Sequence, residues 1–275
     1  MKITDEILHK VWAVELEILD VIHSICKKHN LKYSLAYGTL IGAVRHGGFI
    51  PWDDDIDLMM PRKDYEKLKR VWKDEAPADY LMMDIESHKD IPNTFAKVVK
   101  NNTTFLQNEE AREKSYPKGI FVDIIPGDLV APKGIRRKIQ YIISAVYLLY
   151  TRGYASGTKG VIGFIEKVLL KMPREKQHKW RQKAGKSLQK WNDANADEMF
   201  FVDILSDCKK YHPADMFDNL SEISFCGKKY NAVASYDRYL TTVYGDYMQL
   251  PPEENRVWRH HPIVIDFEHN YEDLE

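Results

Sequence analysis

The sequence contains few cysteines and no long apolar run. Its three cysteines, Cys26, Cys208 and Cys226, are odd in number and form no C-x-x-C spacing, which argues against a disulfide framework and against a zinc site. No segment reaches the roughly 18 consecutive apolar residues of a membrane-spanning helix, and the first residues, MKITDEILHK, contain no apolar signal core. These absences predict a protein of a reducing cytoplasm.

Internal repeats and low-complexity linkers are also absent. Hydrophobic residues make up 44% of the sequence and charged residues 29%, which is the balance of an ordinary globular protein. A length of 275 residues suits one large domain or two small ones with a buried core.

The net charge of −1 conceals a basic segment. Residues 133–190 contain fifteen Lys or Arg residues against two acids, Glu166 and Glu175, a local balance of +13 that leaves −14 for the remainder. Apolar stretches at Tyr141–Tyr150 and Val161–Leu170 alternate with the basic clusters. This pattern fits helices resting on an anionic membrane, or a helical subdomain with a solvated basic face. No RNA- or DNA-binding motif accompanies the charge, so nucleic acid is not an expected partner.

An acidic run occupies the centre of the segment Gly38–Met60, GTLIGAVRHGGFIPWDDDIDLMM. If the run is a strand, its period of two places Asp55 and Asp57 on one face, and a backward extension adds Asp53. Carboxylates held that close repel one another unless a divalent cation such as Mg²⁺ or Mn²⁺ lies between them. The alternative is a solvated acidic turn after Pro51.

A phosphate-binding turn is predicted just upstream of the acids. Leu31–Tyr37 alternates like a strand, Gly38 and Thr39 follow it, and a short helix is expected at Leu40–His46. Free N–H groups at a helix N-terminus favour phosphate, and Arg45 on that helix is a candidate clamp. A phosphate site beside paired carboxylates indicates phosphoryl transfer.

A third acid is embedded in the apolar run of Gly119–Asp128, GIFVDIIPGD. Asp123 should lie on a buried strand, where a carboxylate must be paired, hydrogen-bonded or bound to metal. A structural Asp satisfied by backbone N–H groups is the alternative. Asp128 follows Pro126 and Gly127 and is expected in a turn or at a helix cap.

Two basic residues are further candidates for binding substrate. Lys97 lies in a predicted strand at Phe95–Lys100, and a half-buried lysine needs an anionic partner. Arg62 begins a predicted helix at Arg62–Trp72 and either contacts substrate phosphate or pairs with a nearby acid. The adjacent His260 and His261 are not expected to share one metal ion, because neighbouring side chains point apart.

Residues 38–65, GTLIGAVRHGGFIPWDDDIDLMMPRKDY, resemble the LicD family of phosphorylcholine transferases, a branch of the nucleotidyltransferase-like fold. The resemblance continues through GIFVDIIPGD and the tail YLTTVYGDYMQLPPEE at Tyr239–Glu254, and is weakest in the middle of the chain. It implies an α/β fold with a mixed sheet and flanking helices. The expected parts are a catalytic core at 1–132, a basic helical insertion at 133–195 and a C-terminal part at 196–275 that packs back on the core.

The resemblance also implies roles for the candidate residues. Asp55, Asp57 and Asp123 would be catalytic, and these three with Asp53 would hold Mg²⁺ or Mn²⁺. The residues expected to bind substrate are Gly38, Thr39, Arg45, Lys97 and Arg62.

The reaction implied by the resemblance transfers a phospho-alcohol to a sugar hydroxyl. CDP-choline or another CDP-alcohol would be the donor, and CMP would leave. The acceptor would be a glycan or teichoic acid precursor of the cell envelope, free or lipid-linked. Three alternatives stay open: nucleotidylyl transfer from an NTP, a glycosyltransferase with a D-x-D metal site, and a non-catalytic module that binds glycan or membrane. The expected location is cytoplasmic, with contact of residues 133–190 at the inner face of the cell membrane as an option.

Overall fold

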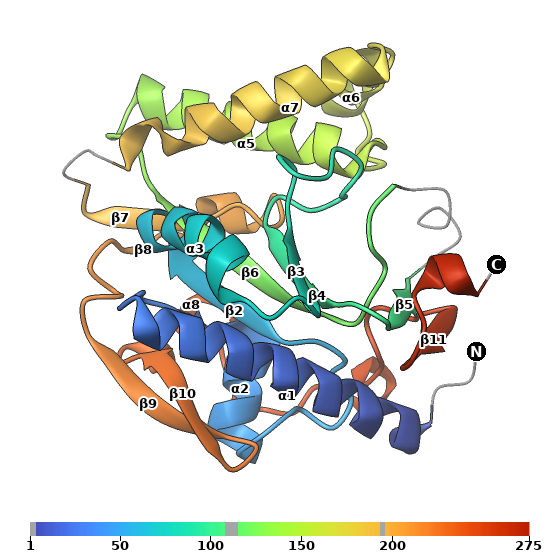
Figure 1. The fold of residues 1–275 in the computed structure, drawn as a ribbon. Coiled ribbons are helices and arrows are strands. Elements are labelled where there is room, and N and C mark those ends of the chain that lie inside the picture. The colour runs from blue at the N-terminus through green and yellow to red at the C-terminus, as the bar shows by residue number, and fades with distance from the viewer. Residues whose placement is uncertain (1–3, 108–114, 193–195, 275) are drawn as a thin grey trace.

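The structure is a computed structural model, and it describes residues 4–107, 115–192 and 196–274 (Figure 1). Apolar residues that recur every three or four positions predict a helix at Thr4–His29, and it is found as α1 (Asp5–Lys28). Thr4 caps it, since its Oγ1 accepts a hydrogen bond from the N–H of Ile7. The apolar stripe of α1 is buried, so this helix is a scaffold for the sheet.

A mixed sheet forms the centre of the described chain and confirms the predicted α/β class. Its strand order is β1-β2-β6-β4-β3, and β7 continues from β6 to β8. β2 and β6 are parallel, whereas every other neighbouring pair in this sheet is antiparallel. The strands are β1 (Ser34–Leu35), β2 (Asp57–Pro61), β3 (Tyr80–Met83), β4 (Ala96–Lys100), β6 (Phe121–Leu129), β7 (Glu198–Phe201) and β8 (His212–Pro213).

The two central strands are buried on both faces. Leu58, Met59 and Met60 of β2 are all fully buried, so the expected alternation of one covered and one open face is not found. Helices α1 and α3 (Arg62–Glu75) lie side by side across this part of the sheet (Figure 1). A strand covered on both faces has an apolar run rather than a period of two.

Smaller elements surround the first strand and the sheet edge. Helix α2 (Tyr37–His46) begins three residues earlier than predicted and ends at Gly47, which is left-handed. The sequence predicts a helix at Tyr236–Tyr244 that ends near Gly245, and it is found as α8 with those bounds. The remaining strands are the hairpin β9 (Leu220–Phe225) and β10 (Lys228–Val233), and the pair β5 (Thr104–Leu106) and β11 (Val264–Asp266). Short 3-10 turns lie at 189–191, 207–209, 253–255 and 271–273.

The basic segment forms a helical layer that covers one end of the sheet. Helices α5 (Ile135–Arg152) and α7 (Arg174–Leu188) pack against each other, and α6 (Val161–Leu170) joins them (Figure 1). Arg181 fastens the layer to the core by donating to the carbonyls of Lys89, Ile91 and Asn93. The division of the chain into parts at 1–132, 133–195 and 196–275 stays a prediction, and residues 193–195 lie outside the described residues. Within the described chain, no helix combines the length and the apolar character needed to cross a membrane.

Candidate active site

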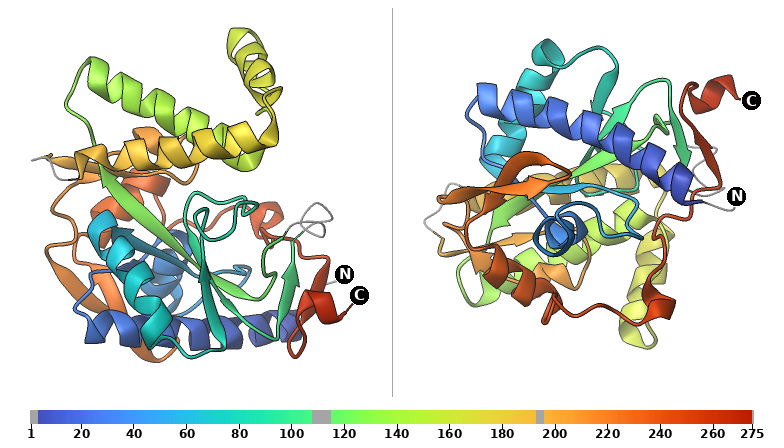
Figure 2. Two further views of the ribbon diagram at one scale, coloured as in Figure 1. Left: turned by 45° about the horizontal axis from the view of Figure 1, so that its top comes forward. Right: turned by 90° about the horizontal axis from the view of Figure 1, so that it is seen from below.

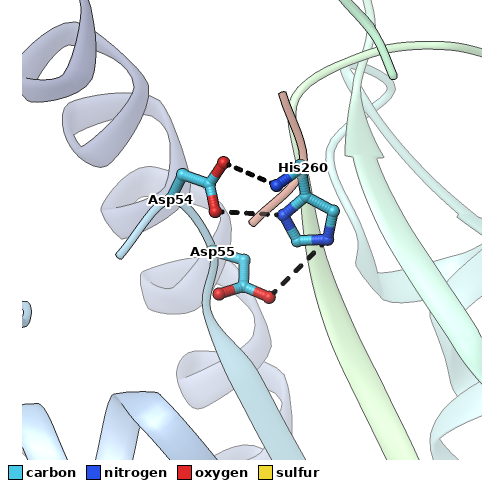
Figure 3. Close-up of side chains that lie close together, drawn as sticks. All are labelled: Asp54, Asp55 and His260. Atoms are coloured by element: carbon cyan, nitrogen blue, oxygen red, sulfur yellow. Dashed lines mark hydrogen bonds and ion pairs between the residues drawn. The ribbon is translucent and has the colours of Figure 1, made fainter. Parts of the chain in front are cut away.

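Most of the acidic run precedes strand β2 instead of lying within it. β2 begins at Asp57, and residues 53–56 form the segment that leads into it. The expectation that one strand aligns Asp53, Asp55 and Asp57 is therefore wrong, because only Asp57 has strand geometry. The preceding segment instead presents Asp54 and Asp55 to His260 near the C-terminal end of the chain (Figure 3).

Three charged side chains lie in one row across the sheet. Asp57 on β2 pairs in register with Asp123 on β6, which pairs in register with Lys97 on β4, so all three share one face. The Nζ atom of Lys97 lies 2.6 and 2.8 Å from the two carboxylate oxygens of Asp123 and 3.4 Å from the ring centre of Phe121. The predictions that Lys97 needs an anionic partner and that Asp123 is paired are confirmed, and each is the partner of the other.

His260 holds the start of the acidic run in place. Its Nδ1 lies 3.1 Å from Oδ1 of Asp54, and its Nε2 lies 3.9 Å from Oδ2 of Asp55 (Figure 3). The backbone N–H groups of Arg259 and His260 also donate to Asp54, at 3.4 and 3.2 Å. Burial alone lowers the pKa of His260, but the hydrogen bond to Asp54 and the charge of Asp55 raise it overall. The contacts with these two carboxylates therefore outweigh burial in setting the direction of the shift.

Burial raises the pKa values of the predicted acidic residues. It is the largest cause for Asp53, Asp55, Asp57 and Asp123, and the charge of Asp55 raises the pKa values of Asp53 and Asp57 further. His260 and Lys97 lower the pKa values of their own partners but do not cancel the effect of burial. The cluster is thus short of positive charge.

Two buried carboxylate oxygens in the acid cluster have neither a hydrogen-bond donor nor a cation beside them in the described chain. Oδ2 of Asp53 and Oε2 of Glu15, a buried residue of α1, have no hydrogen-bond partner among the described residues. Burial raises the pKa of Glu15, and the charges of Asp55 and Asp54 add to it. Buried charges are ordinarily paired or bound to a metal. The donor set consists of hard oxygen ligands, so it fits a cation such as Mg²⁺ or Mn²⁺.

Gly38 and Thr39 connect the first turn of α2 to the acids. A Cβ atom at position 38 would lie 2.4 Å from Oδ2 of Asp53, so only glycine leaves room for that carboxylate. Oγ1 of Thr39 accepts a 2.8 Å hydrogen bond from the N–H of Asp57. Gly38 and Thr39 therefore lie beside the acids, but within α2 and not in a turn before it, and their contact with phosphate stays a prediction.

The two candidate arginines bind other parts of the protein. Arg45 lies in the last turn of α2, where its Nη1 donates to the carbonyl of Tyr247 at 2.7 Å. Arg62 makes two hydrogen bonds of 2.8 and 2.7 Å to the carboxylate of Asp128. For Arg62 the structure thus shows the alternative interpretation, a pair with an acid, although that acid is 66 residues away.

The prediction that Asp128 lies in a turn or at a helix cap is wrong. It lies within β6 and is fully buried. The strand continues through Pro126 and Gly127 because Gly127 and Asp128 pair with Phe201 and Phe200 of β7. A Cβ at Gly127 would collide with side chains of β7, so glycine permits this pairing.

Several residues of the site were not among the sequence candidates. Asp54, Asp55 and His260 bring ligand atoms within 4.8 Å of one another, and only Asp55 was a candidate. Asp203, which follows β7, has its pKa raised to about 7 by burial and by the charges of Asp207 and Asp123. The resemblance of the tail at Tyr239–Glu254 was the only sequence signal that placed the C-terminal part near the acids.

Replacing His260 by Gln should reduce catalysis without unfolding the protein. The variant loses the charge that balances Asp55 and the bond that orients Asp54, so we expect a rate about 10 to 100 times lower, as for other groups that position active-site side chains. His261→Gln is the matched control, because His261 is exposed. The comparison requires steady-state kinetics of both variants with the donor described below. Equal rates for the two variants would exclude a positioning role.

Comparison with known proteins identifies the family. Residues 30–126 match the model of the LicD/FKTN/FKRP nucleotidyltransferase domain. The chain is 32% identical over 267 residues to the lipopolysaccharide cholinephosphotransferase LicD of Haemophilus influenzae, covering 92% of this chain and 96% of that protein. An uncharacterized protein of Rickettsia prowazekii is 27% identical over 110 residues, 39% of this chain and 41% of that protein. One of Rickettsia typhi is 44% identical over 48 residues, 18% of this chain and 16% of its own length.

The matched residues include both strands that carry the predicted acids, since residues 30–126 contain β2 and most of β6. The similarity to the Haemophilus protein also extends across nearly the whole chain. The chain therefore belongs to the LicD family.

Proposed function

We propose that this chain is a phosphocholine transferase that uses CDP-choline or another CDP-alcohol and releases CMP. The acceptor in this proposal is a sugar hydroxyl of lipopolysaccharide or of a related envelope glycan, such as a teichoic acid precursor. The observation that carries the proposal is the similarity to a lipopolysaccharide cholinephosphotransferase along 92% of the chain. The buried acid cluster supports it, because phosphoryl transfer depends on positioning and on electrostatic stabilisation.

Mg²⁺ or Mn²⁺ is the cofactor in this proposal. Asp55, Asp57 and Asp123 are the candidate ligands, with Asp53 as a further one. His260 is better suited to positioning, because its ring and its backbone N–H are both hydrogen-bonded to Asp54 and hard cations prefer oxygen ligands. When bound, the metal would offset negative charge on the phosphate oxygens of the donor.

The protein groups supply orientation and a base. The oxygen of the acceptor hydroxyl forms a bond to the phosphorus that carries choline, while the bond from that phosphorus to the oxygen of CMP breaks. The hydroxyl proton needs an acceptor, and a buried carboxylate with a raised pKa is suited to that task. Asp123 has a raised pKa, and Lys97 fixes the direction of its carboxylate, so Asp123 is the candidate base in the alternative in which Asp53, and not Asp123, completes the metal site.

The proposed place of the donor diphosphate is beside the acids. The N-terminus of α2, with Gly38 and Thr39 in its first turn, offers N–H groups of the kind that bind phosphate. Lys97 shares the face of the sheet that carries Asp57 and Asp123, and it is available to the diphosphate when Asp123 accepts a proton or a metal. Arg45 is a weaker candidate, because backbone carbonyls already occupy its guanidinium.

The proposal is tested by measuring CMP release from CDP-choline, CDP-ethanolamine, CDP-glycerol and CDP-ribitol with Mg²⁺ and a glycan acceptor extract. We expect CMP from CDP-choline and none after chelation with EDTA. Release from another donor alone would keep the reaction class and change the alcohol. Pyrophosphate from an NTP, with no CMP from any of the four donors, would instead establish nucleotidylyl transfer.

A further inference from the structure

Helix α6 presents an apolar surface that the rest of the described protein leaves uncovered. Only Gly163 of its ten residues is buried. Its exposed apolar side chains leave between 48 and 74% of their surface open to solvent; they are Val161, Ile162, Phe164, Ile165 and Val168. In both views of Figure 2 the helix extends away from the sheet. An apolar patch of this kind marks an interaction site.

We propose that α6 docks the protein on an anionic membrane surface by inserting these side chains at the level of the lipid headgroups. Short amphipathic helices bind in this way when apolar residues are combined with cations. The proposal rests on this surface alone and does not depend on the reaction that the protein catalyses.

The charge around α6 selects lipid over a second copy of the chain. Lys159, Lys167 and Lys171 precede, interrupt and follow the apolar residues, and all three are exposed. They belong to residues 133–190, which contain fifteen basic and two acidic residues. Two copies that met through α6 would bring two strongly cationic layers together. An anionic bilayer attracts the same layer, and this attraction acts within a Debye length of its surface.

The acid within α6 does not oppose this contact. Glu166, the acid within α6, is paired with Arg152 at 2.6 Å and accepts hydrogen bonds from the backbone N–H and the hydroxyl of Ser156. Its charge is therefore used to fix α6 on the preceding loop.

The test is co-sedimentation of the full chain with vesicles of two compositions. One contains equal parts of phosphatidylcholine and phosphatidylglycerol, and the other contains phosphatidylcholine alone. We expect binding to the anionic vesicles to be about tenfold tighter or more, and to weaken as salt is added. Equal binding to the two vesicle types, or no binding to either, would overturn the proposal.

Two double variants assign the binding to α6. Ile162→Ser with Phe164→Ser should lose about tenfold or more of the vesicle binding, whereas Met248→Ser with Val257→Ser, which also removes two exposed apolar side chains, should lose none. Lys159→Glu with Lys171→Glu should abolish the preference for anionic lipid, with the exposed Lys73→Glu and Lys229→Glu as the matched charge control.

Measurements in solution distinguish the binding of lipid by α6 from the binding of a second copy of the chain. All substituted side chains are exposed, so the variants should keep the circular dichroism and the melting temperature of the wild type. They should also release CMP at the wild-type rate from a soluble donor, which distinguishes this proposal from the transferase proposal. A dimer in sedimentation velocity that disappears in the Ile162→Ser, Phe164→Ser variant, without vesicle binding by the wild type, would assign α6 to a second copy and refute membrane docking.

Discussion

Asp57→Asn is expected to lower the rate of CMP release by about a thousandfold, comparable with the loss of a group that stabilises charge in a transition state. Asp57 is the acid of the run that belongs to the sheet, and its register places it beside Asp123. Asparagine retains the shape of the side chain but removes one negative charge from the proposed metal site. The measurement is kcat/KM for CDP-choline at saturating acceptor and Mg²⁺.

The same substitution should not weaken the fold. The pKa of Asp57 is raised in the folded protein, so its ionised form destabilises the metal-free native state at neutral pH. We therefore expect the free energy of unfolding of Asp57→Asn, measured with urea in EDTA, to equal or exceed that of the wild type. Asp74→Asn on the exposed side of α3 is the control for both measurements. A variant that retains activity within threefold would remove Asp57 from the catalytic assignment.

Arg62→Met is expected to reduce the free energy of unfolding by about 3–5 kcal/mol, the usual cost of removing one partner from a buried ion pair. Asp128 is fully buried and accepts two hydrogen bonds from Arg62 and one of 2.7 Å from Asn192. Without the guanidinium its charge has no cationic partner among the residues that the structure describes. Urea unfolding of the wild type and the variant measures the loss.

A second comparison separates this structural role from substrate binding. Lys63, the next residue of α3, is exposed. Lys63→Met should therefore change the free energy of unfolding by less than about 0.5 kcal/mol. The double variant Arg62→Met with Asp128→Leu should recover part of the lost stability, because no buried charge is left unpaired. If Arg62→Met instead unfolds like the wild type and raises KM for CDP-choline, the residue contacts phosphate as first predicted.

Local sequence signals predict the elements that local interactions determine. The apolar spacing and the cap at Thr4 define α1, and the helix at Tyr236–Tyr244 has the predicted bounds. The apolar runs around Lys97 and Asp123 predict buried strands, and the cost of burying a charge predicts that each residue has a partner. That the two residues pair with each other follows from the register of β4 and β6, which no local pattern specifies.

Long-range packing accounts for what the sequence patterns missed. Asp53, Asp54 and Asp55 offer no apolar side chain to the sheet. The strand therefore starts at Asp57, and the segment before it turns toward His260. Pro-Gly-Asp is a turn signal in isolation, yet pairing with β7 and the charge of Arg62 keep Asp128 inside a strand. His260 has no signal of its own, because its role exists only once the chain has folded.

The position of His260 in the chain also has a consequence for biosynthesis. His260 follows Asp54 by 206 residues, and the segment that carries it is held by the pairing of β11 with β5. A ribosome that adds roughly 5–20 residues per second would deliver the imidazole about 10–40 s after the carboxylate that it orients. For that interval the nascent chain carries an acid cluster without its histidine. A chain released before His260 would retain both acid-bearing strands and still lack the side chain that completes the site.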